Sequence, residues 1–152
     1  MDLPARQTAS VDDCLYAAGF FDGEGCISIC QTERSIRVQL NVTNTALRPL
    51  EWLRDRWGGS IYSAHRPGQG HRQQSWQWTL PPARIALFLE DVLPHLQIKH
   101  TAANNAIELL RLKATTPRFG RTETVRAELR ARLEVHQGLG LDRRRSLRAK
   151  PQ

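Results

Sequence analysis

The 152-residue chain predicts an α+β domain in the order helix, β-hairpin, helix, β-hairpin and then further helices. Two patterns predict this class. In some segments apolar residues recur every three to four positions, as in amphipathic helices, and in others they alternate with polar residues, as in half-buried strands. The length suits one domain with a real core. We expect residues 1–141 to form it and the basic tail, residues 142–152, to be disordered.

The sequence predicts both ends of the first helix. Ser10 and Asp13 have capping-box spacing, and the Asp-Gly step at 22–23 is expected to end the helix where the carboxylates begin. Gly19 and Gly23 are four residues apart, so one face carries no side chains and another helix can approach it closely. The apolar positions at helical spacing are Leu15, Ala18 and Phe21.

A hairpin is predicted next, with a turn near residues 33–35. Its first strand alternates Ile27 and Ile29 with Ser28 and Cys30. The second strand alternates apolar Ile36, Val38, Leu40 and Val42 with polar Arg37, Gln39, Asn41 and Thr43. One face of this hairpin can therefore pack on helices, while amides and arginine on the other are groups that read base edges. An ordinary solvated sheet would also be polar outside.

The middle of the chain predicts a helix and a second hairpin. Thr45 is expected to cap a helix that ends at Trp57, before two glycines. Strands at 60–66 and 73–80 then flank a turn at 67–70. Trp76 and Trp78 share one face of the second strand, and we interpret them as core residues rather than base-stacking residues. Ser75, Gln77 and Thr79 lie on its other face.

Helices are expected at 82–92, 101–113 and 123–135. Pro82 opens the first of these, and Pro94 ends it. Residues 93–99 are expected to form a loop or a short extended segment. Beyond Gly140, the run DRRRSLRAKPQ has little to bury and is expected to be frayed, adding at most unspecific phosphate contact.

Composition narrows the class of partner. The formal net charge is +7 and the pI is near 10.2, which favours nucleic acid modestly over a generally solvated basic surface. Cys14, Cys26 and Cys30 lack zinc-site spacing and predict reduced thiols in an intracellular protein. No apolar run is long enough for a membrane span, and the first ten residues are too polar for a signal peptide.

Other chemistries lack their motifs. There is no GxxxxGK phosphate loop, and Gly-Leu-Gly at 138–140 follows a helix rather than a strand. The histidines have no metal-ligand spacing, and no partner set for a catalytic serine or cysteine is recognisable. We therefore expect no small-molecule substrate.

The segment YAAGFFDGEGCISI, residues 16–29, resembles the signature of the LAGLIDADG homing endonucleases, and nine residues match that motif position by position. Only one copy occurs, which resembles the single-motif branch, in which two identical chains form one nuclease. The segments LPHLQIKHTAANNAIELL and TETVRAELRARL are also similar to this family, whereas the hairpin turns and residues 114–121 are unmatched. The resemblance implies an αββαββα fold with a saddle-shaped antiparallel sheet and additional C-terminal helices. Without it, an apolar run ending in DGEG would indicate a core helix and a polar turn.

The resemblance also implies a site. Glu24 occupies the metal-binding position, where aspartate is more familiar, and the Gly23 carbonyl would be a second ligand for Mg²⁺, with Mn²⁺ as a possible substitute. Asn44 matches a residue that orders the attacking water, and Arg48 and Lys99 match basic residues around the phosphate. Expected DNA contacts are Ser28, Cys30, Thr32, Arg34, Arg37, Gln39, Asn41, Ser63, His65, Arg66, Arg72, Ser75, Gln77 and Thr79. Expected dimer contacts are Ala18, Gly19, Asp22 and Gly23.

The leading hypothesis is a homodimeric, magnesium-dependent endonuclease that cuts double-stranded DNA at a long, near-palindromic target. The alternative is a binding module on the same fold, either an intron-splicing maturase or a DNA-binding regulator that does not cut. A purely structural domain conflicts with the polar, arginine-bearing strand face.

Overall fold

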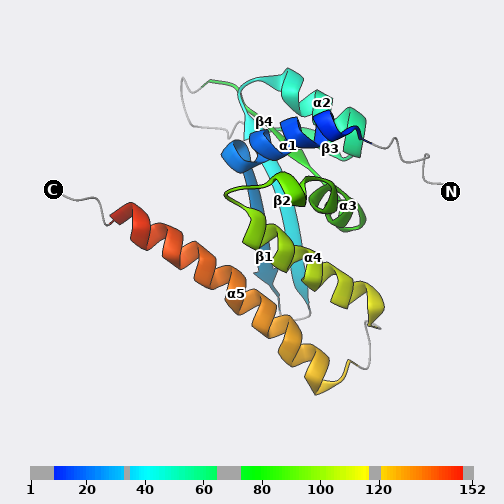
Figure 1. Ribbon diagram of the computed structural model, residues 1–152, viewed down its shortest axis with the longest axis vertical. Coiled ribbons are helices and arrows are strands. Elements are labelled where there is room, and N and C mark those ends of the chain that lie inside the picture. The colour runs from blue at the N-terminus through cyan, green and yellow to red at the C-terminus, as the bar shows by residue number, and fades with distance from the viewer. Residues whose placement is uncertain (1–8, 33–34, 65–72, 117–120, 149–152) are drawn as a thin grey trace.

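A computed structural model describes residues 9–32, 35–64, 73–116 and 121–148 (Figure 1). Its elements confirm the predicted order of helices and hairpins and the α+β class. They are α1 (Val11–Glu24), β1 (Gly25–Gln31), β2 (Ile36–Asn44), α2 (Leu47–Trp57), β3 (Ser60–Ser63), β4 (Trp76–Thr79), α3 (Pro82–Val92), the 3₁₀ turn η1 (Leu93–His95), α4 (His100–Thr115) and α5 (Glu123–Arg148).

The strands form one four-stranded antiparallel sheet in the order β1-β2-β4-β3. Ile27 lies opposite Leu40 in the first hairpin, and Val42 lies opposite Trp78 where the two hairpins meet. Helices α1, α3 and α4 cover one face of this sheet, with α5 running along α4 (Figure 1).

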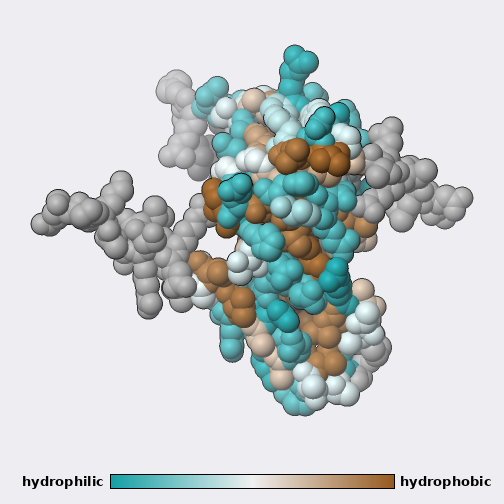
Figure 2. All heavy atoms as spheres, in the orientation of Figure 1, coloured by the Kyte–Doolittle hydropathy of each residue, from teal (hydrophilic) through white to brown (hydrophobic). Residues whose placement is uncertain are grey.

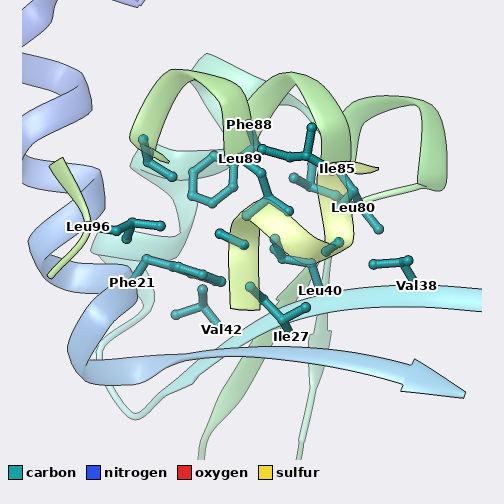
Figure 3. Packing of buried hydrophobic residues seen from close by; sticks show 14 of the residues in the cluster. Phe21, Ile27, Val38, Leu40, Val42, Leu80, Ile85, Phe88, Leu89 and Leu96 are labelled. Carbon is teal, nitrogen blue, oxygen red and sulfur yellow. The ribbon is translucent and has the colours of Figure 1, made fainter. Parts of the chain in front are cut away.

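The core fills the space between that covered face and the helices. Figure 3 shows the side chains of β1 and β2 meeting those of α1 and α3. Phe88 lies at the centre of an aromatic cluster, because its ring makes edge-to-face contacts with Phe21, Trp57 and Trp78 at centroid distances of 5.4, 5.2 and 5.3 Å. Such pairs add to the free energy already gained by burying the rings.

The start of α1 is as predicted, but its end is not. Ser10 and Asp13 form both bonds of the capping box. The helix then continues through the Asp-Gly step to Glu24, so both motif carboxylates lie on its last turn instead of in a turn after it. A tertiary contact of Asp22, described below, accounts for the difference.

Helix α2 begins one residue later than a Thr45 cap would require. Its N-cap is Ala46, which makes no side-chain capping bond. Instead, the Asn44 side-chain oxygen accepts a hydrogen bond from the Ala46 N–H at 2.8 Å. The expected stop is confirmed, since Gly58 and Gly59 adopt φ angles of 80° and 91°, which other residues rarely take.

The tryptophan side chains are core residues, as predicted. Trp78 is fully buried, and its indole N–H donates to the Gly58 carbonyl at 2.8 Å. Trp57 is also buried and donates to Asp91 at 3.0 Å. Trp76 is half-buried against the same cluster.

The C-terminal helices appear where periodicity placed them, with one correction. Helix α5 was expected to end at Val135 and the chain to be disordered from residue 142, but α5 continues to Arg148. Leu129 and Leu133 are buried against the rest of the molecule and dock its first half. In the described part of the chain, no helix combines the length and the apolarity needed to cross a membrane.

Candidate functional site

The last turn of α1 is tied to the loop before α4 through Asp22. Its carboxylate accepts hydrogen bonds from the backbone N–H groups of Gln97, Ile98 and Lys99 at 2.8, 3.2 and 3.0 Å. Burial opposes ionisation of this carboxyl, but the three N–H groups and the nearby ammonium outweigh it, so the pKa of Asp22 lies below its ordinary value. Asp22 therefore acts as an ionised anchor between two distant segments.

The Lys99 side chain adds a further contact between the loop before α4 and the end of α1. Its ammonium donates to the backbone carbonyl of Asp22 at 2.5 Å and lies 5.9 Å from the centre of the Phe21 ring. The side chain is buried. The predicted loop thus brings its lysine to the C-terminal end of α1, two residues from Glu24.

Glu24 is exposed; it is the last residue of α1, and strand β1 begins directly after it. The next residue, Gly25, has no room for a side chain, because a Cβ there would lie 2.1 Å from an atom of the Phe21 ring. Gly25 lies opposite Val42, so the end of α1 meets the end of β2. Asn44 follows Val42 by two residues and is the last residue of β2, at this same end of the sheet.

The remaining basic candidate, Arg48, lies near the start of helix α2. Arg48 is exposed in the first turn of α2, just after Asn44. Within the described ranges, neither the Arg48 nor the Glu24 side chain makes a hydrogen bond or an ion pair, whereas the Asn44 side-chain oxygen accepts a hydrogen bond from the Ala46 N–H. The fold therefore brings Lys99 and the end of α1 together at the end of the sheet where β1 begins and β2 ends, and Asn44 and Arg48 follow Val42 there by two and six residues. We call this end of the sheet the junction edge.

The donor set at this edge fits a hard divalent cation. The last carbonyls of a helix lack intrahelical partners and carry its negative dipole end. In α1 this end also bears Asp22 and Glu24, and its last turn contains no basic residue. Lys99 and three backbone N–H groups already offset the charge of Asp22, so the charge left to offset is that of Glu24 and the helix end. A cation beside the Glu24 carboxylate and the Gly23 carbonyl would do this, and oxygen ligands suit Mg²⁺ or Mn²⁺. Among the described residues, no three His, Cys, Asp or Glu side chains come together as a metal site, so one copy offers little more than Glu24.

The sheet face opposite the helices is polar and lies outside the hydrophobic core. Cross-strand partners share a face, so the register assembles rows across it. One row crosses all four strands and contains Cys26, Asn41, Thr79 and Ser60. A second row contains Thr43, Gln77 and Tyr62. In two further rows, Ser28 lies opposite Gln39 and Cys30 lies opposite Arg37. None of these side chains is buried. We call this set the open face.

The open face corrects one sequence expectation and adds residues that it missed. Ser63 lies opposite Trp76, so it belongs to the helix-covered side, where it accepts a hydrogen bond from Gln74 at 2.6 Å. Thr32 uses its hydroxyl within the turn to Ser35. The candidates Arg34, His65, Arg66 and Arg72 lie outside the described residues. Extending the alternation finds Cys26 and Thr43, but Ser60 and Tyr62 emerge only from the pairing of β3 with β4.

The outer side of α1 differs from both faces of the sheet. Gly19 and Gly23 have open space where a side chain would be. Apolar side chains flank them on the same helix: Val11, Leu15 and Tyr16 are 68%, 50% and 52% exposed. Figure 2 shows hydrophobic surface, in brown, over part of α1. Of the other expected dimer contacts, Ala18 and Asp22 are buried within the chain itself and leave almost no side-chain surface for a partner.

Solved structures share this architecture at low sequence identity. The homing endonuclease I-CvuI, in complex with its target, matches with a TM-score of 0.63 and 20% identity over 86% of this chain and 82% of its own. The archaeal intron-encoded homing endonuclease I-Vdi141I, complexed with DNA, matches with a TM-score of 0.55 and 15% identity over 83% and 95%. The LAGLIDADG meganuclease I-AabMI, bound to uncleaved DNA, gives 0.62 and 16% over 79% of this chain but 43% of its own.

No protein-family model and no curated protein matches the chain. The structural matches nevertheless agree with the motif at residues 17–25, the order of the elements and the sheet topology. The chain therefore has the fold of the LAGLIDADG homing endonucleases.

Proposed function

We propose that two copies of this chain form a site-specific endonuclease that hydrolyses phosphodiester bonds in double-stranded DNA. The observation that carries the proposal is the continuity between the open face and the junction edge. A surface of hydrogen-bonding side chains ends at the end of the sheet where the last residue of α1, Glu24, exposes its carboxylate and Lys99 contacts α1, with Asn44 at the end of β2. A duplex lying along the open face would have its backbone beside these groups.

The open face has the chemistry of base readout. Amides, hydroxyls and an arginine can donate to and accept from base edges in the major groove. The strand rise of about 3.3 Å is close to the base-pair step of about 3.4 Å, so side chains two residues apart reach pairs about two steps apart. Thr43, Asn41, Gln39 and Arg37 would therefore read positions at increasing distance from the cut.

At the junction edge, Glu24 and the Gly23 carbonyl would hold Mg²⁺. The bound cation supplies a water of lowered pKa and neutralises charge developing on the phosphate. Asn44 would orient the attacking water, and its side-chain oxygen is already held by the Ala46 N–H. Lys99 and Arg48 add positive charge near the phosphate, where it counts most in the transition state.

A second copy would dock against α1. Gly19 and Gly23 allow close helix approach, and the exposed apolar residues beside them would be covered by a partner. Pairing there brings two Glu24 carboxylates together, one for each DNA strand. The relative chain lengths also support two copies, since the match with this chain covers 43% of I-AabMI but 82% of I-CvuI. I-CvuI is a homing endonuclease in complex with its target, and I-AabMI is a meganuclease bound to uncleaved DNA.

The runner-up is a DNA-binding protein or maturase on the same fold that does not cut. One experiment separates the two. A randomised duplex library is incubated with the chain with and without Mg²⁺, and both bound and cleaved molecules are sequenced. A near-palindromic consensus among cleaved duplexes, dependent on the cation, supports the nuclease. A consensus among bound duplexes that are never cut in Mg²⁺ or Mn²⁺ supports the binding module.

A further inference from the structure

The three cysteines of the chain fall into two environments. Cys14 is buried in the core, whereas Cys26 and Cys30 are exposed on the open face. The two exposed thiols are four residues apart along β1, so their Cα atoms are about 13 Å apart, whereas a disulfide needs less than about 7 Å. They cannot bridge to each other, and each can react only with an external partner.

Both exposed thiols lie among the groups that are proposed to read DNA. The Cys26 sulfur is 3.6 Å from the Ser28 hydroxyl, and the Cys30 thiol donates to the Gln39 side-chain oxygen at 4.0 Å. A substituent on either sulfur would therefore stand between the duplex and several contact residues at once.

Charge adds a preference for the kind of substituent. Arg37 lies directly opposite Cys30 in the register. Among the described side chains of the open face, it is the only charged one. A reagent that carries carboxylates would find a guanidinium beside the thiol, and the resulting adduct would occupy that guanidinium and bring negative charge toward phosphate.

We propose that Cys26 and Cys30 form a modification site at which an anionic low-molecular-weight disulfide blocks DNA binding reversibly. This inference rests on the proposed function, because it assumes that the open face binds DNA. In each reaction the cysteine thiolate attacks one sulfur of the disulfide. The protein–S–S–R bond forms, the R–S–S–R bond breaks, and one R–S⁻ leaves; a second thiol reverses the exchange.

The test uses the full chain, glutathione disulfide and the duplex consensus from the library selection, in Ca²⁺. Mass spectrometry should count two adducts on the folded chain and a third only after unfolding. Affinity should fall about tenfold or more, because an adduct that displaces one base contact already costs about that much. Dithiothreitol should restore it, and bound duplex should slow modification of Cys26 and Cys30 but not of Cys14.

Two variants provide matched controls. Cys14→Ala keeps both surface thiols and should lose affinity on treatment as the native chain does. In the double variant Cys26→Ser/Cys30→Ser, treatment should not change affinity, whatever its starting value. Full modification of both cysteines with unchanged affinity would overturn this inference alone. If the untreated chain binds no duplex, the proposed function fails, and this inference fails with it.

Discussion

Asp22 and Lys99, 77 residues apart in sequence, join the end of α1 to the start of α4 by two hydrogen bonds in which Lys99 is always the donor. Its backbone N–H donates to the Asp22 carboxylate at 3.0 Å, and its ammonium donates to the Asp22 carbonyl at 2.5 Å. Because Glu24 follows two residues later, this pair determines where α1 presents its exposed carboxylate.

Replacing the anchor should lower stability in a pH-dependent way. In Asp22→Asn, an amide N–H₂ would face an N–H donor, so we expect a loss of about 1–3 kcal/mol near pH 7. The folded-state pKa of Asp22 is lowered, so its contribution is present above the unfolded-state pKa of about 3.9 and is lost as pH falls through the folded value. Urea unfolding at several pH values should therefore show a gap that narrows below about pH 4.

A matched control for this experiment is Asp55→Asn. Asp55 is a surface residue whose side chain is 68% exposed and whose ion pair with Arg54 is long, at 3.9 Å. Exposed pairs contribute little to stability. A gap for Asp22→Asn that stays constant from pH 7 to pH 3 would show that the carboxylate charge does not stabilise the junction.

The same anchor shows where local sequence patterns reach their limit. The order of helices and strands follows from periodicity within short windows and was predicted. The end of α1 was not, because Asp22 reaches N–H groups 75 to 77 residues away. Local patterns also could not show on which face Ser63, an expected DNA contact, lies. Strand β3 is a short edge strand, and only the pairing of Ser63 with Trp76 reveals which way its residues point.

The candidate site was predictable to the extent that it follows a motif or an alternation. Residues 17–25 carry the motif, and Arg37, Gln39 and Asn41 carry the alternation. Tyr62 carries neither signal, although it shares a row with Gln77. The helical continuation of α5 to Arg148 was missed because the charge run there lacks an apolar stripe.

A bulky residue at Gly19 should break the proposed dimer without harming the fold. No atom lies within 4 Å of the position of a Cβ at Gly19, and leucine favours helix over glycine by nearly 1 kcal/mol. Gly19→Leu should therefore fold and sediment as one chain. Gly138→Leu is the control, because Gly138 is an equally open glycine within α5. A Gly19→Leu chain that remains dimeric and cuts normally would refute this interface.

Gln39 should read a base rather than a phosphate. Its side-chain oxygen accepts a hydrogen bond from the Cys30 thiol, and the side chain is exposed on the open face. Gln39→Ala should relax preference at one symmetric pair of target positions by about 1–3 kcal/mol. Binding selection on partly randomised duplexes measures this, with Gln137→Ala on α5 as the control. Uniform weakening across all sequences would instead indicate a phosphate contact.

Lys99 should contribute to both stability and cleavage, and one variant can separate them. Lys99→Met keeps much of the buried stem but removes the donor to the Asp22 carbonyl. We expect a modest loss of stability and a larger loss in the single-turnover cleavage rate, with target affinity nearly retained. If the rate at saturating protein falls no further than the loss of folded chain explains, Lys99 is a structural residue only.

The most direct test of the junction edge is Glu24→Gln. A carboxylate facing the DNA backbone repels phosphate unless a cation lies between them. Removing its charge should leave target affinity unchanged or raise it, while cleavage of both strands is lost along with the cation. Equilibrium binding in Ca²⁺ and single-turnover cleavage in Mg²⁺ measure the two properties separately.

Glu51→Gln on α2 is the control, because it removes the same charge from another helix. It should cut at the native rate. The Glu24 side chain is exposed and makes no hydrogen bond or ion pair within the described residues, so its replacement should not lower the free energy of unfolding. If Glu24→Gln cuts at the native rate, the cation is held elsewhere; if it loses binding and cutting together, Glu24 acts in positioning DNA and not in the chemistry.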